Sequence, residues 1–340
     1  MNGPAPSTTS FSRTLDPEQV ARLSAALAPE PAAPAQPVDV VRLPEGVYRI
    51  AGPSGTFIVR LARDEAHLAA LRREARVAAG MRERVTLALP DIRVLDDVAG
   101  CPACAAHHII PGEPLTTELV AAMSPAARER LVADLARFFR ETHAMPLYEA
   151  CGWLSIPDDS ARRTAALAAQ FGKPIWFHAA ELRARLAGRL KPEESVLFEQ
   201  TAAQFAALGI DPDWMVFGHG DMHGFNVAMG RDALGPKLVG AFDLGNTGIL
   251  DVHEDFFRLS LVGEDLLEQV LAAYLTQRLK GRGRPWSSSP GRRRTLSRER
   301  IAIYYRAFLF YLMAESGADA LANLRALLQK HAQYEAQVNC

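Results

Sequence analysis

The residues best suited to chemistry lie in one short stretch, FGHGDMHGFNVAMG, at positions 217–230. Here His219, Asp221 and His223 alternate with other residues. Two imidazoles around a carboxylate suit a transition metal, so one interpretation is a metal-dependent hydrolase. Such a site needs further His or Asp clusters, and the later GNTG segment (245–248) contains no histidine. Another alternative is that these residues form a buried polar turn with no catalytic role.

Spacing over a longer range favours phosphoryl transfer. Asp221 is followed five positions later by Asn226, and after an apolar run by Asp243 in a DLG triplet. Protein kinases place a catalytic Asp, an Asn and a later Asp in this order, the last two as magnesium ligands. A hydroxyl nucleophile needs a nearby carboxylate, and a triphosphate needs hard oxygen ligands around Mg²⁺. We expect a hairpin with Asp221 and Asn226 on one limb and Asp243 on the other.

Two longer motifs make this specific. HGDMHGFNV (219–227) and AFDLGNTGILDVHEDFFRL (241–259) resemble the paired signatures of the aminoglycoside phosphotransferase family and its choline-kinase-like relatives, which share the kinase fold. The resemblance covers residues 38–340. It implies that Asp221 is the catalytic aspartate and that His219 is a structural residue at the head of the catalytic loop.

The same resemblance assigns the other acidic and amide residues of the motifs. It implies that Asn226 and Asp243 bind Mg²⁺ beside ATP or GTP. Asp255 matches the family's downstream aspartate that braces the catalytic loop, and Asp251 matches the acid that precedes it. His223 is expected to be structural, or to lie on the substrate side.

The first part of the chain matches the nucleotide-binding region of the family. Arg60 takes the place of the strand-borne lysine, and Glu74 the place of its partner carboxylate. A charge-assisted pair would direct the guanidinium toward the α- and β-phosphates, although an ordinary surface ion pair is the alternative. The chain has no G-x-G-x-x-G motif. HHIIPGEPL (107–115) resembles the connector between lobes, which implies that the backbone of His108 and Ile110 contacts adenine.

The elements that must position these residues follow from periodicity. Short β-branched runs and one amphipathic helix dominate up to residue 112, and apolar residues at helical spacing dominate after it. The strands are expected at 46–51, 56–62, 91–97 and 105–110, with a helix at 64–81. We therefore predict an α+β, two-lobed protein-kinase-like fold. Its small N-lobe, residues 38–112, is an antiparallel sheet plus one helix, and its large, mainly helical C-lobe is residues 113–340.

Further elements are expected in the C-lobe and at the two low-complexity segments. Helices are predicted after Ser124, near 160–207 and near 300–338, and brief strands at 214–219 and 237–244. Residues 1–37, rich in Pro and Ala, are predicted to be a mobile tail with one short helix near 16–27. The basic segment 281–297 is predicted to be a solvated loop, and the alternative is that it binds nucleic acid or an anionic substrate.

Composition limits the partners. The formal net charge of −1 gives no general attraction to nucleic acid or to an anionic membrane, and no apolar run reaches the roughly 20 residues of a membrane span. Four cysteines without a secretory signal favour a reducing cytoplasm. Cys101 and Cys104 could suggest zinc with the nearby histidines, but core thiols are the simpler interpretation. We expect a cytoplasmic monomer or homodimer without nucleic-acid or membrane partners.

The predicted activity is phosphorylation of a hydroxyl on a small molecule, with ATP or GTP as donor. The alternatives are a nucleotide-binding pseudokinase that regulates a partner, and the metal-dependent hydrolase. FDLGNTGILD resembles the aminoglycoside 2''-phosphotransferase branch, while macrolides, choline, homoserine and sugar-like acceptors stay open. Four acids could face a polycationic acceptor: Asp251, Glu254, Glu264 and Asp265. The helix predicted at 301–314 is expected to be core, with an aromatic edge beside the acceptor.

Overall fold

The computed structural model describes most of both predicted lobes. The described residues are 11, 14–27, 39–43, 46–52, 55–156, 177–209, 211, 214–276 and 296–338. Almost all of the basic segment predicted at 281–297 lies outside these ranges, as do residues 157–176 of one predicted helical stretch.

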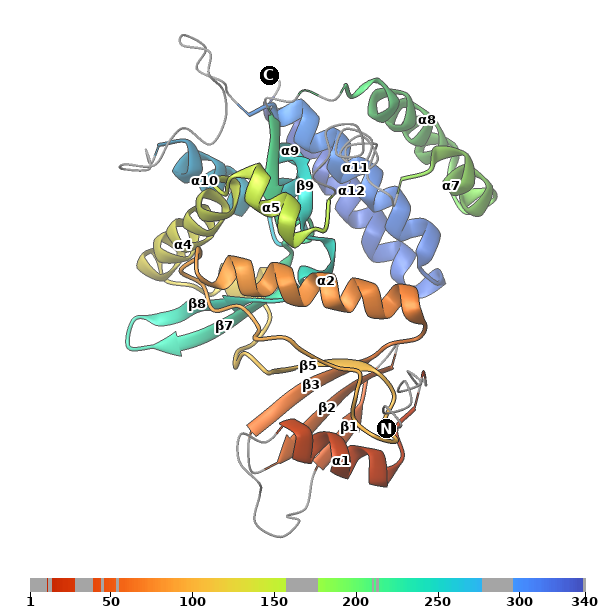
Figure 1. Ribbon diagram of the computed structural model, residues 1–340. Helices are drawn as coiled ribbons and strands as arrows, with labels where there is room; N and C mark the ends of the chain where they lie inside the picture. The colour runs from red at the N-terminus through yellow and green to blue at the C-terminus, as the bar shows by residue number, and fades with distance from the viewer. Residues whose placement is uncertain are drawn as a thin grey trace, which may run out of the picture.

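A five-stranded antiparallel sheet forms the N-lobe (Figure 1). Its strands follow the order β1-β2-β3-β5-β4. Their bounds are β1 Asp39–Arg42, β2 Val47–Gly52, β3 Gly55–Leu61, β4 Arg93–Leu95 and β5 Cys104–His108. In β3, alternate residues are buried, as a strand with one face on the core requires. The predicted strands and the hairpin between β2 and β3 are confirmed.

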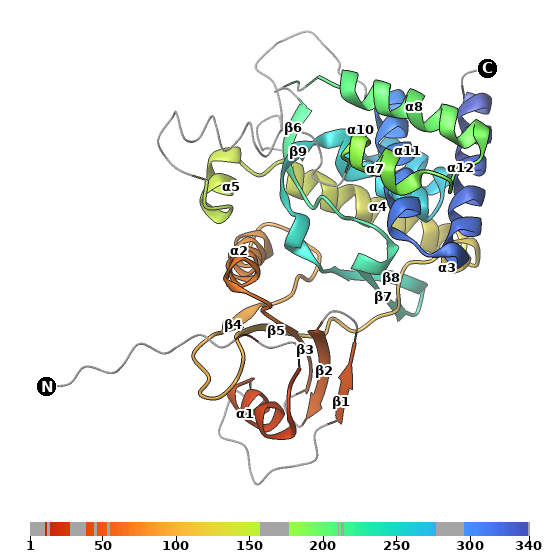
Figure 2. The same ribbon diagram turned by 90° about the vertical axis from the view of Figure 1, so that its right-hand side faces the viewer.

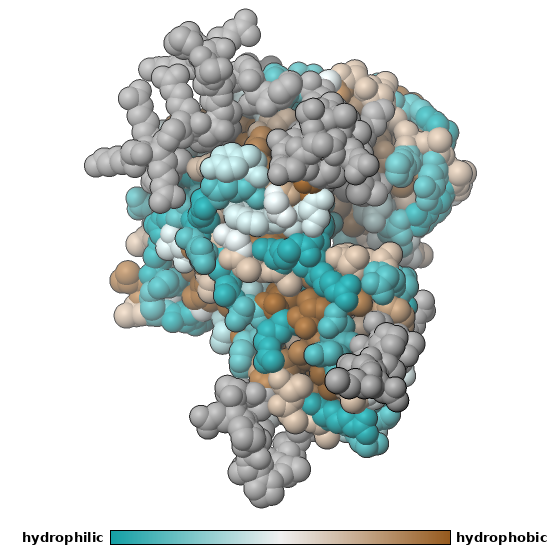
Figure 3. Space-filling view, in the orientation of Figure 1, coloured by the Kyte–Doolittle hydropathy of each residue, from teal (hydrophilic) through white to brown (hydrophobic). Residues whose placement is uncertain are grey.

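Helix α2, Glu65–Arg82, lies between this sheet and the C-lobe (Figures 1 and 2). The Asp64 side chain accepts the N–H of His67 and so caps its first turn. The buried face of α2 includes Leu68, Leu71 and Glu74. On the face drawn in Figure 3, apolar side chains gather between α2 and the sheet, within a mostly hydrophilic surface.

Helix α1, Pro17–Leu27, covers the N-lobe sheet on the side away from the C-lobe (Figure 2). Val20, Leu23 and Leu27 form a buried stripe against the sheet. The backbone N–H of Leu15 also donates to the Tyr48 hydroxyl at 3.1 Å. The predicted helix near 16–27 therefore forms, but it packs on the core. A mobile tail through residue 37 was the wrong description of this part, because an amphipathic stripe buries the outer face of the sheet.

The C-lobe is mainly helical, as predicted. Its helices pack around α4, which begins after Ser124 with Pro125 at its first position, and α11, which is buried along most of its length. The α-helices are α3 Thr117–Ala121, α4 Pro125–His143, α5 Leu147–Trp153, α7 Ala179–Leu186, α8 Pro192–Ala207, α9 Val252–Phe256, α10 Glu264–Thr276, α11 Arg298–Glu315 and α12 Ala318–Val338. None of the helices in the described ranges is long and apolar enough to cross a membrane.

Two short strand pairs interrupt the helices. β6, Met215–Gly218, pairs with β9, Gly248–Asp251, and β7, Val227–Asp232, pairs with β8, Gly235–Ala241. The predicted strands near 214–219 and 237–244 correspond to β6 and β8, whereas β9 was not predicted. Three 3₁₀ turns complete this region: η3 Gly224–Asn226, η4 Leu244–Asn246 and η5 Phe257–Leu261.

The β7–β8 hairpin connects the two lobes. Glu113, in the connector after β5, exchanges two backbone hydrogen bonds of 2.9 and 2.8 Å with Met229 of β7. Ala88, after α2, donates to Val239 and accepts from Ala241 of β8 at 3.3 and 3.0 Å. The interlobe connector and the loop between α2 and β4 of the N-lobe are thus joined to the same hairpin.

The packing of α1 gives a stability prediction. Because Leu23 is fully buried against the sheet, Leu23→Ala should lower the free energy of unfolding by about 2–5 kcal/mol. Chemical denaturation would measure this change. Ala25→Ser, at an exposed position of the same helix, is the matched control and should cost less than about 1 kcal/mol. Equal stability of Leu23→Ala and the wild type would contradict a packed α1.

Candidate active site

A buried carboxylate holds the loop between β6 and β7 that carries His219 and Asp221. Asp255 of α9 accepts the backbone N–H of His219 on Oδ2 at 3.1 Å and that of Gly220 on Oδ1 at 2.7 Å. His143 Nε2 lies 2.9 Å from the same Oδ2. Burial alone would raise the pKa of Asp255, but the bonds from His143 and Gly220 hold it below its ordinary value. The predicted bracing contact is present.

Two glycines let the loop approach its neighbours. Gly220 has a φ of +73°, and a Cβ there would collide with the carbonyl oxygen of Asn246. A Cβ at Gly224 would collide with the carbonyl oxygen of Leu115. The close packing therefore needs both glycines of the motif.

The His219 ring connects the loop to the DLG triplet. Its Nδ1 accepts the backbone N–H of Asp221 at 3.2 Å, and its Nε2 lies 3.1 Å from the carbonyl oxygen of Phe242. An accepting Nδ1 leaves the proton on Nε2, which donates to that oxygen. Both ring nitrogens are therefore engaged in the fold, as expected of a structural residue.

Three nitrogen-bearing side chains surround the Asp221 carboxylate, and two of them were not predicted from the sequence. Arg258 Nε lies 2.7 Å from Oδ1, and Asn246 Nδ2 donates to Oδ2 at 3.0 Å. His223 Nε2 lies 3.7 Å from Oδ1. The motif FFRLSL carries a signal for Arg258, because an arginine inside an apolar run must find a partner in the core.

His223 lies beside Asp221 in the same loop. Its Nδ1 accepts the backbone N–H of Phe225 at 3.1 Å, so Nε2 carries the proton and faces Asp221. Burial lowers the pKa of His223, an effect that Asp221 partly opposes and Arg258 reinforces. The ring is therefore neutral at pH 7.

Asn226 and Asp243 lie at the open end of the β7–β8 hairpin, as predicted. The carbonyl of Asn226 accepts the N–H of Phe242 at 3.0 Å, which holds the two positions side by side. Asn226 Nδ2 donates to the Asp221 carbonyl at 2.9 Å, so its Oδ1 is left for another partner. The Asp243 side chain is 47% exposed, on a left-handed residue with φ of 59°. A carboxylate and an amide oxygen fit the ligand preference of Mg²⁺.

Arg60 and Glu74 form the predicted pair inside the interlobe region. Arg60 Nη2 lies 2.5 Å from Glu74 Oε2, and Arg60 Nη1 lies 4.0 Å from Asp243 Oδ1. Glu74 Oε1 accepts the N–H of Leu244 at 3.2 Å. Burial raises the pKa of Glu74 and Arg60 opposes this rise. With side-chain exposures of 22% and 4%, this is not an ordinary surface ion pair.

The connector brings His108 and Ile110 to the end of β5. The His108 ring packs on Phe57 with centroids 4.1 Å apart, and its carbonyl accepts from His107 Nδ1 at 2.8 Å. That carbonyl keeps one lone pair for a further donor. Ile110 lies over β8, since its side chain would meet a Cβ placed at Gly240. The adenine contacts of both residues stay a prediction.

The histidines do not form a metal site with the neighbouring acids. Within the described ranges, no group of three His, Cys, Asp or Glu residues is placed to hold a metal ion. Cys101 and Cys104 are buried and form no disulfide within the described ranges. Burial raises the pKa of the Cys104 thiol to about 12, so this thiol is not a ready metal ligand or nucleophile.

Comparison with known proteins agrees with this geometry. Residues 42–288 match the family described as "Phosphotransferase enzyme family". The chain belongs to this family. A comparison with curated protein sequences finds no significant match.

Solved structures share the fold at low sequence identity. The GDP complex of wild-type aminoglycoside 2'-phosphotransferase-IIIa has a TM-score of 0.61 and 16% identity, covering 88% of this chain and 93% of that one. The streptomycin–ATP–APH(2'')-IIa ternary complex has a TM-score of 0.57 and 14% identity, and the match covers 93% of this chain and 96% of that one. Macrolide 2'-phosphotransferase type I has a TM-score of 0.52 and 16% identity, and the match covers 86% of this chain and 90% of that one. These similarities confirm the kinase-like fold of the phosphotransferase.

Three of the four acids considered for a polycationic acceptor are engaged elsewhere in the phosphotransferase. Asp251 is buried with His253 Nδ1 at 2.6 Å and Arg300 Nη2 at 2.5 Å. The other two acids both lie on α10. Glu264 pairs with His331 at 2.7 Å, and Asp265 pairs with Arg128 at 2.5 Å. Their carboxylates therefore already have partners within the protein.

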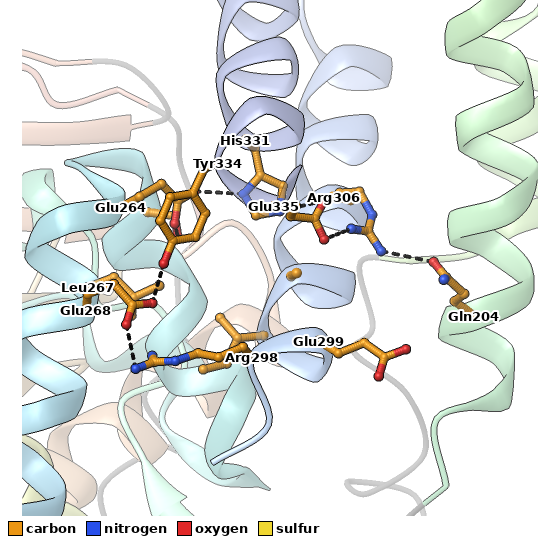
Figure 4. Close-up of a pocket in the computed structure, with 13 residues that line it drawn as sticks. Gln204, Glu264, Leu267, Glu268, Arg298, Glu299, Arg306, His331, Tyr334 and Glu335 are labelled. Carbon is orange, nitrogen blue, oxygen red and sulfur yellow. Dashed lines mark hydrogen bonds and ion pairs between the residues drawn. The ribbon is translucent and has the colours of Figure 1, made fainter. Parts of the chain in front are cut away.

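A separate cavity of about 310 Å³ lies between α8, α10, α11 and α12 (Figure 4). Its polar side chains pair mainly with each other. Arg306 Nη2 donates to Gln204 at 2.9 Å and Nη1 pairs with Glu335, while Arg298 and Tyr334 both contact Glu268, at 2.6 and 2.5 Å. This network joins the four helices at a position distinct from the Asp221 site.

The depressed pKa of Asp255 predicts a pH-dependent contribution to stability. A carboxyl group whose pKa falls on folding stabilises the protein fully above its ordinary value, here 3.8. This contribution is lost as the pH falls from that value through the folded pKa. Asp255→Asn should therefore be less stable than the wild type near pH 6. The difference in unfolding free energy between the two proteins should shrink as the pH falls from about 4 to about 3.

Urea unfolding across this pH range would measure the difference. Asp97→Asn, at an exposed carboxylate, is the matched control and should follow the wild type throughout. A difference between Asp255→Asn and the wild type that stays constant from pH 6 to pH 3 would contradict the assigned role of Asp255.

Proposed function

We propose that this phosphotransferase moves the γ-phosphoryl group of ATP or GTP to a hydroxyl of a small molecule. The observation that carries the proposal is the convergence of Asp221, Asn226 and Asp243 at one end of the β7–β8 hairpin. The Arg60–Glu74 pair faces the same end from the N-lobe. The C-lobe thus supplies one carboxylate for the hydroxyl and two side chains for a metal ion. The N-lobe supplies one cation for the phosphates.

In the proposed reaction, Asp221 accepts a hydrogen bond from the acceptor hydroxyl and directs its oxygen at the γ-phosphorus. The new oxygen–phosphorus bond forms as the bond to the β,γ-bridging oxygen breaks. The hydroxyl proton passes to Asp221, and the nucleoside diphosphate leaves. Arg60 would contact the α- and β-phosphates. Mg²⁺ held by Asn226 and Asp243 would neutralise charge on the phosphates.

Two rivals are less well supported. A regulatory pseudokinase has no need of Asp221, Asn226 and Asp243 together. A hydrolase built on His219, Asp221 and His223 needs free imidazole nitrogens. Both ring nitrogens of His219 and Nδ1 of His223 already bond to the protein.

The acceptor is proposed only as a small hydroxylated molecule. Kanamycin and streptomycin appear in complexes of proteins with this fold, so aminoglycosides are reasonable first compounds to test. We do not expect aminoglycoside amines to bind the carboxylates of Asp251, Glu264 and Asp265, because these carboxylates are already paired. A cytoplasmic location and a monomeric or homodimeric state remain predictions.

Nucleotide binding tests the proposal directly. A ligand that binds only the folded state stabilises it by about 2.7 kcal/mol at a hundred times its dissociation constant. A thermal-shift titration with Mg²⁺-ATP and Mg²⁺-GTP should therefore raise the melting temperature of the wild type. Asp243→Ala should weaken the shift by removing a proposed metal ligand. Asp97→Ala, at an exposed site distant from the hairpin, should keep it.

The two titrations also separate the donors. A larger shift with one nucleotide at equal concentration identifies that nucleotide as the preferred donor. The absence of a shift with both nucleotides would contradict the proposed function, as would an equal shift in the wild type and Asp243→Ala.

A further inference from the structure

We infer that Arg258 is a positioning residue for the transfer reaction: it fixes the Asp221 carboxylate in the orientation that receives the acceptor hydroxyl. The inference rests on the proposed function, because it assigns Asp221 its role there. It adds a residue that sequence analysis did not select. Its basis is the geometry around the two carboxylate oxygens.

The Asp221 carboxylate is held through both of its oxygens. Arg258 Nε lies 2.7 Å from Oδ1, and Asn246 Nδ2 donates to Oδ2 at 3.0 Å. A carboxylate held at only one oxygen can rotate about its Cβ–Cγ bond, whereas contacts at both oxygens restrict this rotation. Each oxygen has two lone pairs, so a position remains for the acceptor hydroxyl.

Arg258 is itself held rigidly. Its guanidinium carbon lies 4.7 Å from the ring centroid of Phe257 and 4.8 Å from that of Phe308 on α11. The residue is only 4% exposed. Cation–π contacts on an enclosed guanidinium limit its movement, so Arg258 can transmit a fixed position to Asp221.

The backbone of Arg258 is anchored to the same loop that carries Asp221. Arg258 follows Asp255 by three residues, in η5 directly after α9. Asp255 fixes the loop backbone through His219 and Gly220, while Arg258 fixes the Asp221 side chain. One short segment therefore controls both the path of the loop and the direction of its carboxylate.

The charge of Arg258 is balanced by Asp221. Among the described residues, Asp221 is the acidic group with which Arg258 forms an ion pair. Nε and Nη1 of Arg258 are both buried without a hydrogen-bond partner in this part of the chain, so the 2.7 Å contact between Nε and Asp221 is a close ion pair and not a hydrogen bond. An enclosed guanidinium with so few partners adds little to stability. A role in positioning Asp221 accounts for keeping it there.

Positioning predicts a change in rate without a change in nucleotide affinity. Misaligned reacting groups lose part of the rate enhancement that a fixed geometry provides. With water as the acceptor, Arg258→Ala should therefore lower kcat for nucleotide hydrolysis by about tenfold to a hundredfold. The KM for Mg²⁺-nucleotide should stay within about twofold, since Arg258 is not a proposed nucleotide contact. Arg258→Lys keeps the charge but lacks the planar fork, so its kcat should be intermediate.

Chemical rescue separates positioning from a general loss of structure. Guanidinium ion at low millimolar concentration should restore part of the kcat of Arg258→Ala, and urea at the same concentration should not. Arg306→Ala is the matched control, because Arg306 is a buried arginine on α11 whose partners are Glu335 and Gln204. Its kcat should be near that of the wild type and should not respond to guanidinium.

Two results would overturn the inference. One is an Arg258→Ala enzyme with the kcat of the wild type, and the other is an enzyme whose nucleotide KM rises while kcat is unchanged. A crystal structure of Arg258→Ala provides a readout that does not depend on turnover. It should show an Asp221 side chain that is rotated or displaced, and an unchanged Asp221 still bound by Asn246 would contradict the inference. Failure of the wild type to bind either Mg²⁺-nucleotide would instead refute the proposed function.

Discussion

The site depends most on the hydrogen bonds between the buried Asp255 carboxylate and the loop that carries Asp221. The N–H groups of His219 and Gly220 point at its two oxygens, and His143 adds a third donor. Burying a carboxylate costs free energy unless its oxygens accept hydrogen bonds. The N–H groups of the loop therefore stabilise the buried charge, and the charge in turn holds the loop in place. The positions of His219 and Asp221 follow from this arrangement.

The second constraint is the β7–β8 hairpin, which serves both lobes. Its strands form hydrogen bonds with Glu113 in the interlobe connector and with Ala88 in the N-lobe loop between α2 and β4. At its open end, Asn226 and Asp243 come together, and the next residue, Leu244, donates to Glu74. A movement of α2 would therefore be transmitted to the DLG triplet, and through the Arg60–Glu74 pair to any bound phosphate.

Much of this could be predicted from the sequence because the signals are local. Alternating apolar residues predict the N-lobe strands. The spacing of Asp221, Asn226 and Asp243 predicts where the hairpin begins and where it ends along the chain. The packed position of α1 was missed because composition dominated the interpretation of the first 37 residues. β9 was missed because GILD is too short to show alternation.

The contacts to Asp221 show the limit of sequence spacing. Arg258 and Asn246 lie 37 and 25 positions from Asp221 in the chain, and only the β6–β9 pairing and the turn into α9 bring them together. The apolar residues around Arg258 indicate burial, but they do not identify its partner. The acids considered for a polycation were misleading for the same reason, because Asp251 and Glu264 find their partners on α11 and α12.

A crystal structure with Mg²⁺ and a non-hydrolysable nucleotide would test the central claim most directly. The account predicts a metal ion on the Asn226 and Asp243 side-chain oxygens, the α- and β-phosphates beside Arg60, and the γ-phosphate within reach of a hydroxyl held by Asp221. It would be contradicted by a metal ion on His219 or His223, or by a nucleotide bound away from the β7–β8 hairpin.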